Sequence, residues 1–247
     1  MKINYYTTFL SIVLFFATSL SLFAQLDENE KLVYKLIKQD NAKKLKKLMN
    51  QDMEFKNYVL TYYSKTEKTY LEQAIDDCSL KTVELLTKNK AIIGYTEEYS
   101  EEIVDIYIDE LSCVFSSKKK KCLVAAYAQL VKNDYVRIRP TLLGRLNCYF
   151  DVVSEWYVEM QPIVKELIGK GLKVEESIIN ITEERENYLI ELCKLEKQFT
   201  EEFTQKEIHD IRNYILFLKE QKVDFKTEIN GKRPIDLLSK EFQKEAE

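Results

Sequence analysis

One pattern of residues recurs along this chain about every 40 residues, and it constrains the fold more than any other feature. An amphipathic helical stretch ends in apolar residues, a short turn follows, and an apolar or small residue comes next. Clear copies lie at 83–91, 164–172 and 215–224, and weaker copies lie at 45–53 and 127–135. One helix pair cannot bury both sides of its apolar stripe, so neighbouring copies must cover each other. The pattern therefore predicts a stack of helix pairs.

The second apolar anchor of each copy measures the length of the repeat. These anchors are Leu48, Leu86, Leu130, Leu167 and Leu218. Their spacings of 38, 44, 37 and 51 residues correspond to one helix pair per repeat, with insertions of variable length.

Glycine and proline are scarce, which favours helices over sheets. The 247 residues contain five Gly and three Pro, whereas sheet-rich chains need many turns made of these residues. Pro140, Pro162 and Pro234 each stand just before a helical pattern, where a proline is tolerated because its missing N–H would be unpaired anyway. The expected fold class is all-α.

Two stretches resemble the ankyrin repeat. Residues 69–74 (Thr-Tyr-Leu-Glu-Gln-Ala) stand where that family opens with Thr-Pro-Leu-His, and Leu85, Leu86 and Ala91 follow at the family's distances. Residues 222–225 and 230–238 resemble the finger turn and the opening of the next repeat.

The resemblance implies a right-handed α-solenoid of about five degenerate ankyrin-like helix-pair repeats over residues 25–247. Helices must be lengthened or insertions present, since the spacings exceed the family's usual length of about 33 residues. Arg233 replaces the family's Thr, and Lys90 and Lys222 replace its Gly, whereas Gly171 keeps it. A solenoid of the tetratricopeptide or HEAT kind is the alternative. Because ankyrin repeats mostly bind proteins, the resemblance implies a protein partner.

The first 24 residues have the layout of a secretory signal peptide. Lys2 is followed by an apolar stretch at 9–23, and Ala24 offers a small residue before the expected cleavage point. The alternative is a membrane anchor, but the stretch is short for a span of about 20 residues and contains hydroxyl groups. We expect a periplasmic or secreted protein of residues 25–247, without membrane insertion after cleavage of the leader.

The charge balance excludes one class of partner. Lys2 is the only charged residue of the leader, so the mature chain has 36 basic and 41 acidic side chains and a net charge near −5. Nucleic-acid binding favours a basic stripe, so no nucleic-acid partner is expected. The abundance of aliphatic and aromatic residues excludes wholesale disorder.

The five cysteines leave at least one thiol unpaired within the chain. Cys113 and Cys122 flank the run Lys118–Lys121, which we interpret as a loop between two helices, with contact to an anionic surface as an alternative role. A disulfide clamping that loop is one hypothesis, and five unpaired, buried cysteines are the other. No Cys-x-x-Cys pair is present, so we expect no metal site.

Neither a catalytic residue nor a cofactor site is predicted. His209, the only histidine, is expected on the exposed face of a helix, and no nucleophile motif accompanies it. Gly169-Lys170-Gly171 follows a helix, whereas phosphate loops precede one, so this segment predicts a helix C-cap.

Two kinds of residue are candidate contacts with a partner. Acidic residues gather at 97–110, and tyrosines fall at predicted loop positions, where they provide apolar area with a polar tip. A solvated helix face and the filling of gaps between repeats are the alternative roles. The predicted partner-binding residues are Tyr62, Tyr63, Tyr95, Tyr99, Glu101, Glu102, Asp105 and Tyr135.

We therefore expect a non-enzymatic protein–protein interaction module outside the cytoplasm, either an inhibitor or immunity-type binder or an envelope scaffold. The alternative is a hydrolase with an unrecognised carboxylate site.

Overall fold

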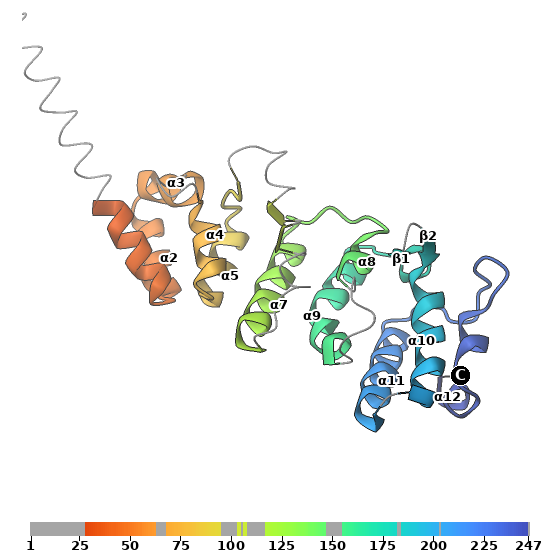
Figure 1. Cartoon of the computed structure of the whole chain (residues 1–247). Helices are drawn as coiled ribbons and strands as arrows, with labels where there is room; N and C mark the ends of the chain where they lie inside the picture. The colour runs from red at the N-terminus through yellow and green to blue at the C-terminus, as the bar shows by residue number, and fades with distance from the viewer. Residues whose placement is uncertain are drawn as a thin grey trace, which may run out of the picture. The chain divides into compact units, whose positions relative to one another are not determined.

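The computed structural model describes residues 28–62, 68–94, 103–104, 106–107, 117–146, 155–181, 184–202 and 204–246. Most of these residues are helical, so the prediction of a mainly helical chain is confirmed (Figure 1). The chain divides into two compact units, Met1–Ile92 and Ile93–Glu247. The expected leader, residues 1–24, lies outside the described residues.

The first unit is a cluster of short helices. A helix at 28–38 is followed by α2 (Ala42–Gln51), α3 (Met53–Thr61), α4 (Tyr70–Asp76) and α5 (Leu80–Lys88). Helix α2 packs against α3 and α5, and α4 packs against α5. Their fully or almost fully buried side chains include Leu36, Ile37, Leu45, Leu71 and Leu86.

Asp40 links the first helix pair to the second. It ends the helix at 28–38 with a φ of 46°, and its Oδ1 accepts hydrogen bonds from the backbone N–H of Thr82 at 2.9 Å and from the Thr82 hydroxyl at 3.0 Å. Ser79, the residue at the N-cap of α5, does not cap the helix itself because its hydroxyl donates to the Ile37 carbonyl at 2.5 Å. The start of α5 is thus stabilised by the preceding helix pair.

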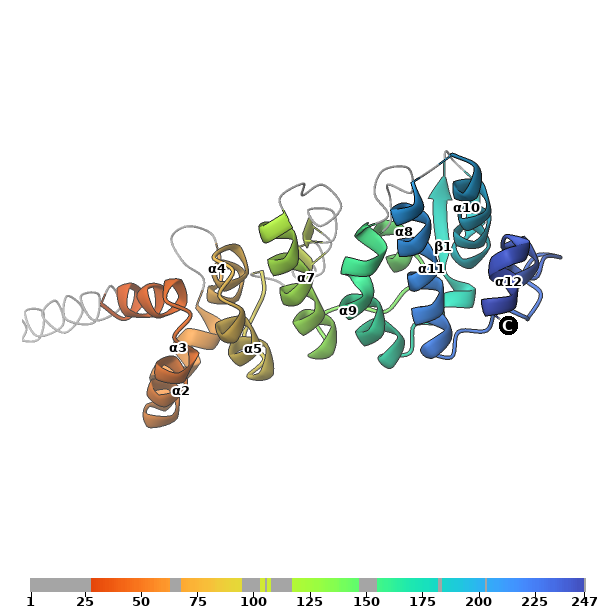
Figure 2. The ribbon, with the colours of Figure 1, turned by 90° about the horizontal axis from the view of Figure 1, so that it is seen from below.

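The described part of the second unit holds longer helices and a short hairpin. Its elements are α7 (Ser117–Lys132), α8 (Leu142–Leu146), α9 (Glu155–Gly169), η1 (Val174–Glu176), β1 (Ile178–Ile181), β2 (Glu184–Asn187), α10 (Tyr188–Glu202), α11 (Gln205–Glu220), η2 (Pro234–Leu237) and α12 (Lys240–Ala246). Helix α9 packs against both α7 and α11, and the three lie side by side in Figures 1 and 2.

Helix α9 corrects one expectation about the prolines. Pro162 lies inside this helix rather than at its start. The helix extends further toward the N-terminus because Tyr157 and Met160 are buried there. Their burial offsets the cost of an internal proline, which is about 3 kcal/mol.

Four of the five predicted repeat anchors end their helices in the same way. In each, the carbonyl of the anchor leucine accepts a hydrogen bond from the N–H five residues later, across a residue with positive φ. The pairs are Leu86 with Ala91, Leu130 with Tyr135, Leu167 with Leu172, and Leu218 with Val223, at 3.0–3.1 Å. The residues with positive φ are Lys90, Asp134, Gly171 and Lys222. This arrangement is a Schellman motif. It confirms the predicted helix C-cap at Gly171.

The anchor Leu48 does not follow this rule. Its carbonyl accepts from Asp52, which is extended, and its side chain is half-buried. The same helix end occurs one helix earlier, at Leu36, whose carbonyl accepts from Asn41 at 2.9 Å across Asp40. It also ends α4, where the Ala74 carbonyl accepts from Ser79 at 2.9 Å across Cys78. The first copy of the pattern therefore lacks the Schellman motif that ends the other four.

The hairpin of β1 and β2 was not predicted. The strands are antiparallel, with Ile178 opposite Asn187 and Ile181 opposite Glu184. Strand β1 packs against α8. A Cβ on Gly144 of α8 would lie 2.5 Å from the Ile178 carbonyl oxygen, so the helix and the strand are in contact through their backbones.

Gly144 should not accept a side chain. We expect Gly144→Ala to lower the free energy of unfolding by about 1–3 kcal/mol, because a Cβ must push α8 and β1 apart. Gly169→Ala is the matched control: no atom lies within 4 Å of its Cβ position, so alanine should be neutral or stabilise by up to about 1 kcal/mol. Urea unfolding followed by circular dichroism measures both. Equal stabilities of the two variants would contradict the close packing of α8 on β1.

The run Lys118–Lys121 is not a loop, which corrects a second expectation. These lysines belong to α7, and Lys120 forms an ion pair with Glu159 of α9 at 2.7 Å. The helix begins early because lysine is a good helix former and because Cys122, Leu123 and Val124 are buried directly after the run.

The three described cysteines are of two kinds. Cys78 and Cys122 are disulfide-bonded, so the hypothesis of five unpaired cysteines is wrong. Cys193 on α10 is a free, buried thiol. Cys113, the proposed partner of Cys122, lies outside the described residues, and their pairing stays a prediction.

Candidate binding surface

Two of the eight predicted contact residues are described, and they lie in different units. Tyr62 belongs to the first unit and Tyr135 to the second. The remaining six lie outside the described residues: Tyr63, Tyr95, Tyr99, Glu101, Glu102 and Asp105.

Tyr62 is part of a cluster of four tyrosines, Tyr34, Tyr58, Tyr62 and Tyr70, here named the tyrosine cluster. Tyr58 and Tyr62 lie one helical turn apart at the end of α3, with ring centroids 4.6 Å apart. Tyr70, the first residue of α4, stacks on Tyr62 at 5.4 Å. Tyr34 meets the ring of Tyr70 edge-on at 5.5 Å. The cluster fills the space between three helices.

The tyrosine cluster is buried on one side and accessible on the other. Tyr70 is almost fully buried, whereas Tyr34, Tyr58 and Tyr62 are half-buried. The hydroxyl groups of Tyr58 and Tyr70 lie 2.8 Å apart and share a hydrogen bond. Tyr62 therefore has both roles considered from the sequence: its ring fills a gap between helices, and part of it faces solvent.

The cluster holds the phenols of Tyr58, Tyr62 and Tyr70 in the neutral form. Burial raises the pKa of Tyr58 to about 12, although the hydrogen bond with Tyr70 partly opposes this shift. The pKa of Tyr62 is raised by burial and then by the carboxylate of Glu30, which also hydrogen-bonds its hydroxyl. The pKa of Tyr70 is raised further, first by burial and then by Tyr58. These side chains offer neutral hydroxyl groups and apolar rings to a partner.

The raised pKa values predict loss of stability in alkali. The folded state keeps protons on Tyr58, Tyr62 and Tyr70 that the unfolded chain releases near pH 10. This contribution is fully present below pH 10 and disappears as the pH rises toward the Tyr58 value of about 12. We expect stability, measured by thermal unfolding, to fall steadily across this window. Tyr58→Phe should make the slope shallower, and an unchanged slope would show that Tyr58 titrates as an exposed phenol.

Tyr135 lies in the turn that ends α7. Its N–H closes the Schellman motif on Leu130, its side chain is half-buried, and burial raises its pKa to about 12. The neighbouring Asp134 is exposed and pairs with Lys170, which lies in the equivalent turn after α9. Tyr135 thus stands in a turn that is tied to the next helix pair.

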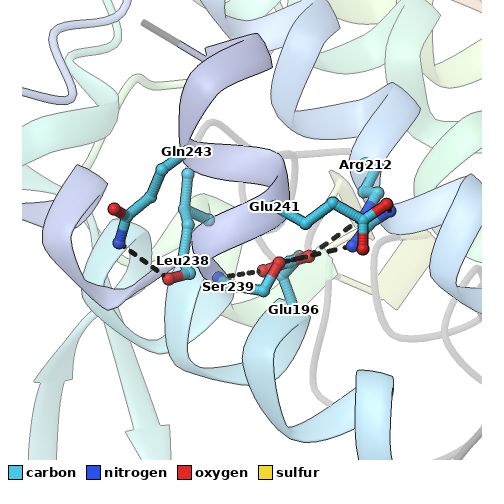
Figure 3. Close-up of polar contacts among 6 residues, drawn as sticks. All are labelled: Glu196, Arg212, Leu238, Ser239, Glu241 and Gln243. Atoms are coloured by element: carbon cyan, nitrogen blue, oxygen red, sulfur yellow. Dashed lines mark hydrogen bonds and ion pairs between the residues drawn. The ribbon is translucent and has the colours of Figure 1, made fainter.

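A buried ionic cluster joins α10, α11 and α12, and the sequence analysis did not identify it. Glu196 of α10 is fully buried and accepts from Arg212 Nε of α11 at 3.0 Å (Figure 3). It also accepts from the backbone N–H and the hydroxyl of Ser239, both at 2.8 Å, just before α12. Arg212 lies 5.1 Å from the centre of the Phe242 ring. Figure 3 also shows Glu241 beside Arg212, at 3.8 Å in the ion pair.

This cluster has the geometry of a structural link. Both oxygens of Glu196 accept hydrogen bonds, and its charge is matched by Arg212. The other carboxylate near Arg212, Glu241, is 85% exposed. General acid–base chemistry would need a carboxyl group within reach of a substrate, whereas Glu196 is enclosed by its partners. Glu196, Arg212 and Ser239 are separated by 16 and 27 positions, so a short sequence motif could not identify the cluster.

The remaining candidates for chemistry are the histidine and a metal site. His209 is exposed on α11, as predicted. Among the described residues, no three His, Cys, Asp or Glu side chains come close enough together to hold a metal ion. Within the same part of the chain, no helix combines the length and apolar character needed to traverse a bilayer.

Comparison with protein-family models, with curated proteins and with solved structures gave no match to this chain.

Proposed function

We propose that this protein is an ankyrin-like helical repeat module that binds another protein outside the cytoplasm. The observation that carries the proposal is the repeated helix end at Leu86, Leu130, Leu167 and Leu218. Repetition of one local geometry at the predicted anchors is expected of stacked helix pairs, and such stacks mostly serve as binding surfaces.

The last turn of the second unit gives further support. Asn230 and Gly231 both have positive φ, and Ile229 bridges to Lys232 across them. Two residues of this kind make the tight turn of a hairpin. The turn lies where the ankyrin resemblance expects a finger, and η2 follows it with Pro234 at its first position.

The location outside the cytoplasm is supported by the cysteines and the leader. Disulfides such as those of Cys78 and Cys122 persist in oxidising compartments. The signal-peptide layout of residues 1–24 leads to the same kind of compartment. The partly exposed tyrosine cluster and the acidic residues Glu101, Glu102 and Asp105 are the proposed contacts.

The test is affinity capture with the exported chain, residues 25–247, as bait in the envelope and secreted fractions of its source. The capture is done both without and with crosslinking, and mass spectrometry identifies the bound proteins. We expect one protein in fixed stoichiometry if the module is an inhibitor, or several weakly held proteins if it is a scaffold. Recovery of no protein under either condition would contradict the proposal.

A matched pair of variants tests the acidic contacts. Charge reversal of Glu101, Glu102 and Asp105 to lysine should weaken binding of a basic partner at low salt. The control reverses three exposed acids of the second unit, Glu220, Glu228 and Glu245. Equal affinity of the two variants would remove the acidic segment from the binding surface.

A further inference from the structure

We propose that the exposed face of α2 docks this protein onto an anionic phospholipid surface. This face, named here the lysine face, consists of Lys43, Lys44, Lys46 and Lys47. It is separate from the proposed protein-binding residues, and the inference does not depend on the proposed function.

The lysine face has a fixed orientation. Leu45 and Met49 of α2 are buried, and the helix packs against α3 and α5. Asn41 caps its start by accepting from the Lys44 N–H at 3.1 Å. The four lysine side chains are exposed, so the fold presents all of them to solvent together.

The lysine face is not neutralised within the described part of the chain. Helix α2 contains no acidic residue, and none of its four lysines forms an ion pair there. The two carboxylates that flank the helix are directed elsewhere. Asp40 accepts from Thr82 at the start of α5, and Asp52 accepts from the N–H of Glu54 at 2.8 Å at the start of α3.

The residue types favour a lipid surface over a protein. Protein interfaces are enriched in Tyr, Trp and Arg and depleted in Lys, and the sequence of α2 contains no aromatic residue and no arginine. Residues 1–92 contain no arginine at all. Lysine acts as a hydrated point charge without the bidentate geometry that specific recognition uses. Clusters of four or more basic residues on a helix suit the diffuse charge of anionic headgroups.

The experiment measures sedimentation of residues 25–247, which include every described residue, with vesicles. One vesicle type is pure phosphatidylcholine and the other contains phosphatidylglycerol. We expect binding to the anionic vesicles at low salt and little binding to the neutral ones. Because each lysine near such a surface contributes roughly fivefold in partition, replacing all four with glutamine should weaken binding by about a hundredfold or more. Salt at about 1 M should have the same effect, since it shortens the screening length to about 3 Å.

A control variant separates the lysine face from net charge. It replaces Lys132, Lys165, Lys219 and Lys226 with glutamine, which are four exposed lysines of the second unit outside the run Lys118–Lys121. This variant removes the same total charge and should keep most of the binding. Unchanged circular dichroism would show that both variants are folded.

Three results would overturn the proposal. The first is sedimentation with neither vesicle type, and the second is an equal loss of binding by both variants, which would indicate a net-charge effect. Lysine-dependent binding to an acidic protein such as polyglutamate, without binding to the anionic vesicles, would assign the lysine face to a protein partner instead.

Discussion

Replacing Glu196 with alanine should lower the free energy of unfolding of the second unit by about 3–5 kcal/mol. The substitution removes a fully buried carboxylate and leaves Arg212, whose side chain is only 20% exposed, without its close partner. It also removes the acceptor for the Ser239 N–H, so the start of α12 loses its link to α10. Urea unfolding followed by circular dichroism measures the change.

Glu241→Gln is the matched control for Glu196→Ala. Glu241 also faces Arg212, at 3.8 Å, but it is 85% exposed, so its loss should cost less than about 0.5 kcal/mol. Glu196→Gln should fall between the two, because an amide oxygen still accepts from Ser239 while the charge on Arg212 is no longer balanced. If Glu196→Ala were as stable as the control, the ionic cluster would not hold α12 to α10.

Replacing Leu86 with alanine should cost about 2–5 kcal/mol, the usual range for a buried leucine. Leu86 is fully buried in α5. Its truncation leaves a cavity where α5 packs on α2 and α4. The loss is measured as a lower midpoint of urea unfolding for the first unit.

Leu48→Ala is the matched control, because it makes the same leucine-to-alanine change in the same unit. Leu48 is half-buried at the end of α2, so we expect a loss below about 1 kcal/mol. The comparison tests whether burial sets the loss at these two anchors, since Leu86 is fully buried and Leu48 is half-buried. A loss at Leu48 as large as the loss at Leu86 would contradict the half-buried position of Leu48.

The part of the fold that could be predicted is the part set by local periodicity. Leu86, Leu130, Leu167 and Leu218 were identified because a helix, a turn and an apolar residue follow one another within about ten positions. Leu48 does not have the predicted helix end because the extended residue Asp52 follows α2 and caps α3, so no residue with positive φ closes a Schellman motif there. The predictions of a helix start at Pro162 and of a loop at Lys118 were wrong because tertiary burial extends both helices past the local signals for their start.

The features that the sequence did not reveal depend on residues far apart in the chain. The backbone contact of Gly144 with β1 joins a helix and a strand more than 30 positions apart. Glu196, Arg212 and Ser239 meet because three helices pack together, and each of them alone resembles any other charged or hydroxyl residue on a helix. Of the predicted contact residues, Tyr62 was recognised as a tyrosine near a loop, but its packing on Tyr70 depends on how α3 meets α4.

The rate of chemical labelling of Cys193 can measure local opening of the second unit. Its thiol lies on the buried face of α10, and burial raises its pKa, so a soluble alkylating reagent meets neither an accessible sulfur nor a thiolate in the native state. Glu196 is on the same helix, three residues further along. The rate at which Cys193 becomes labelled therefore follows the transient exposure of this helix, and it would reveal a loosened ionic cluster under native conditions, before any global unfolding is visible.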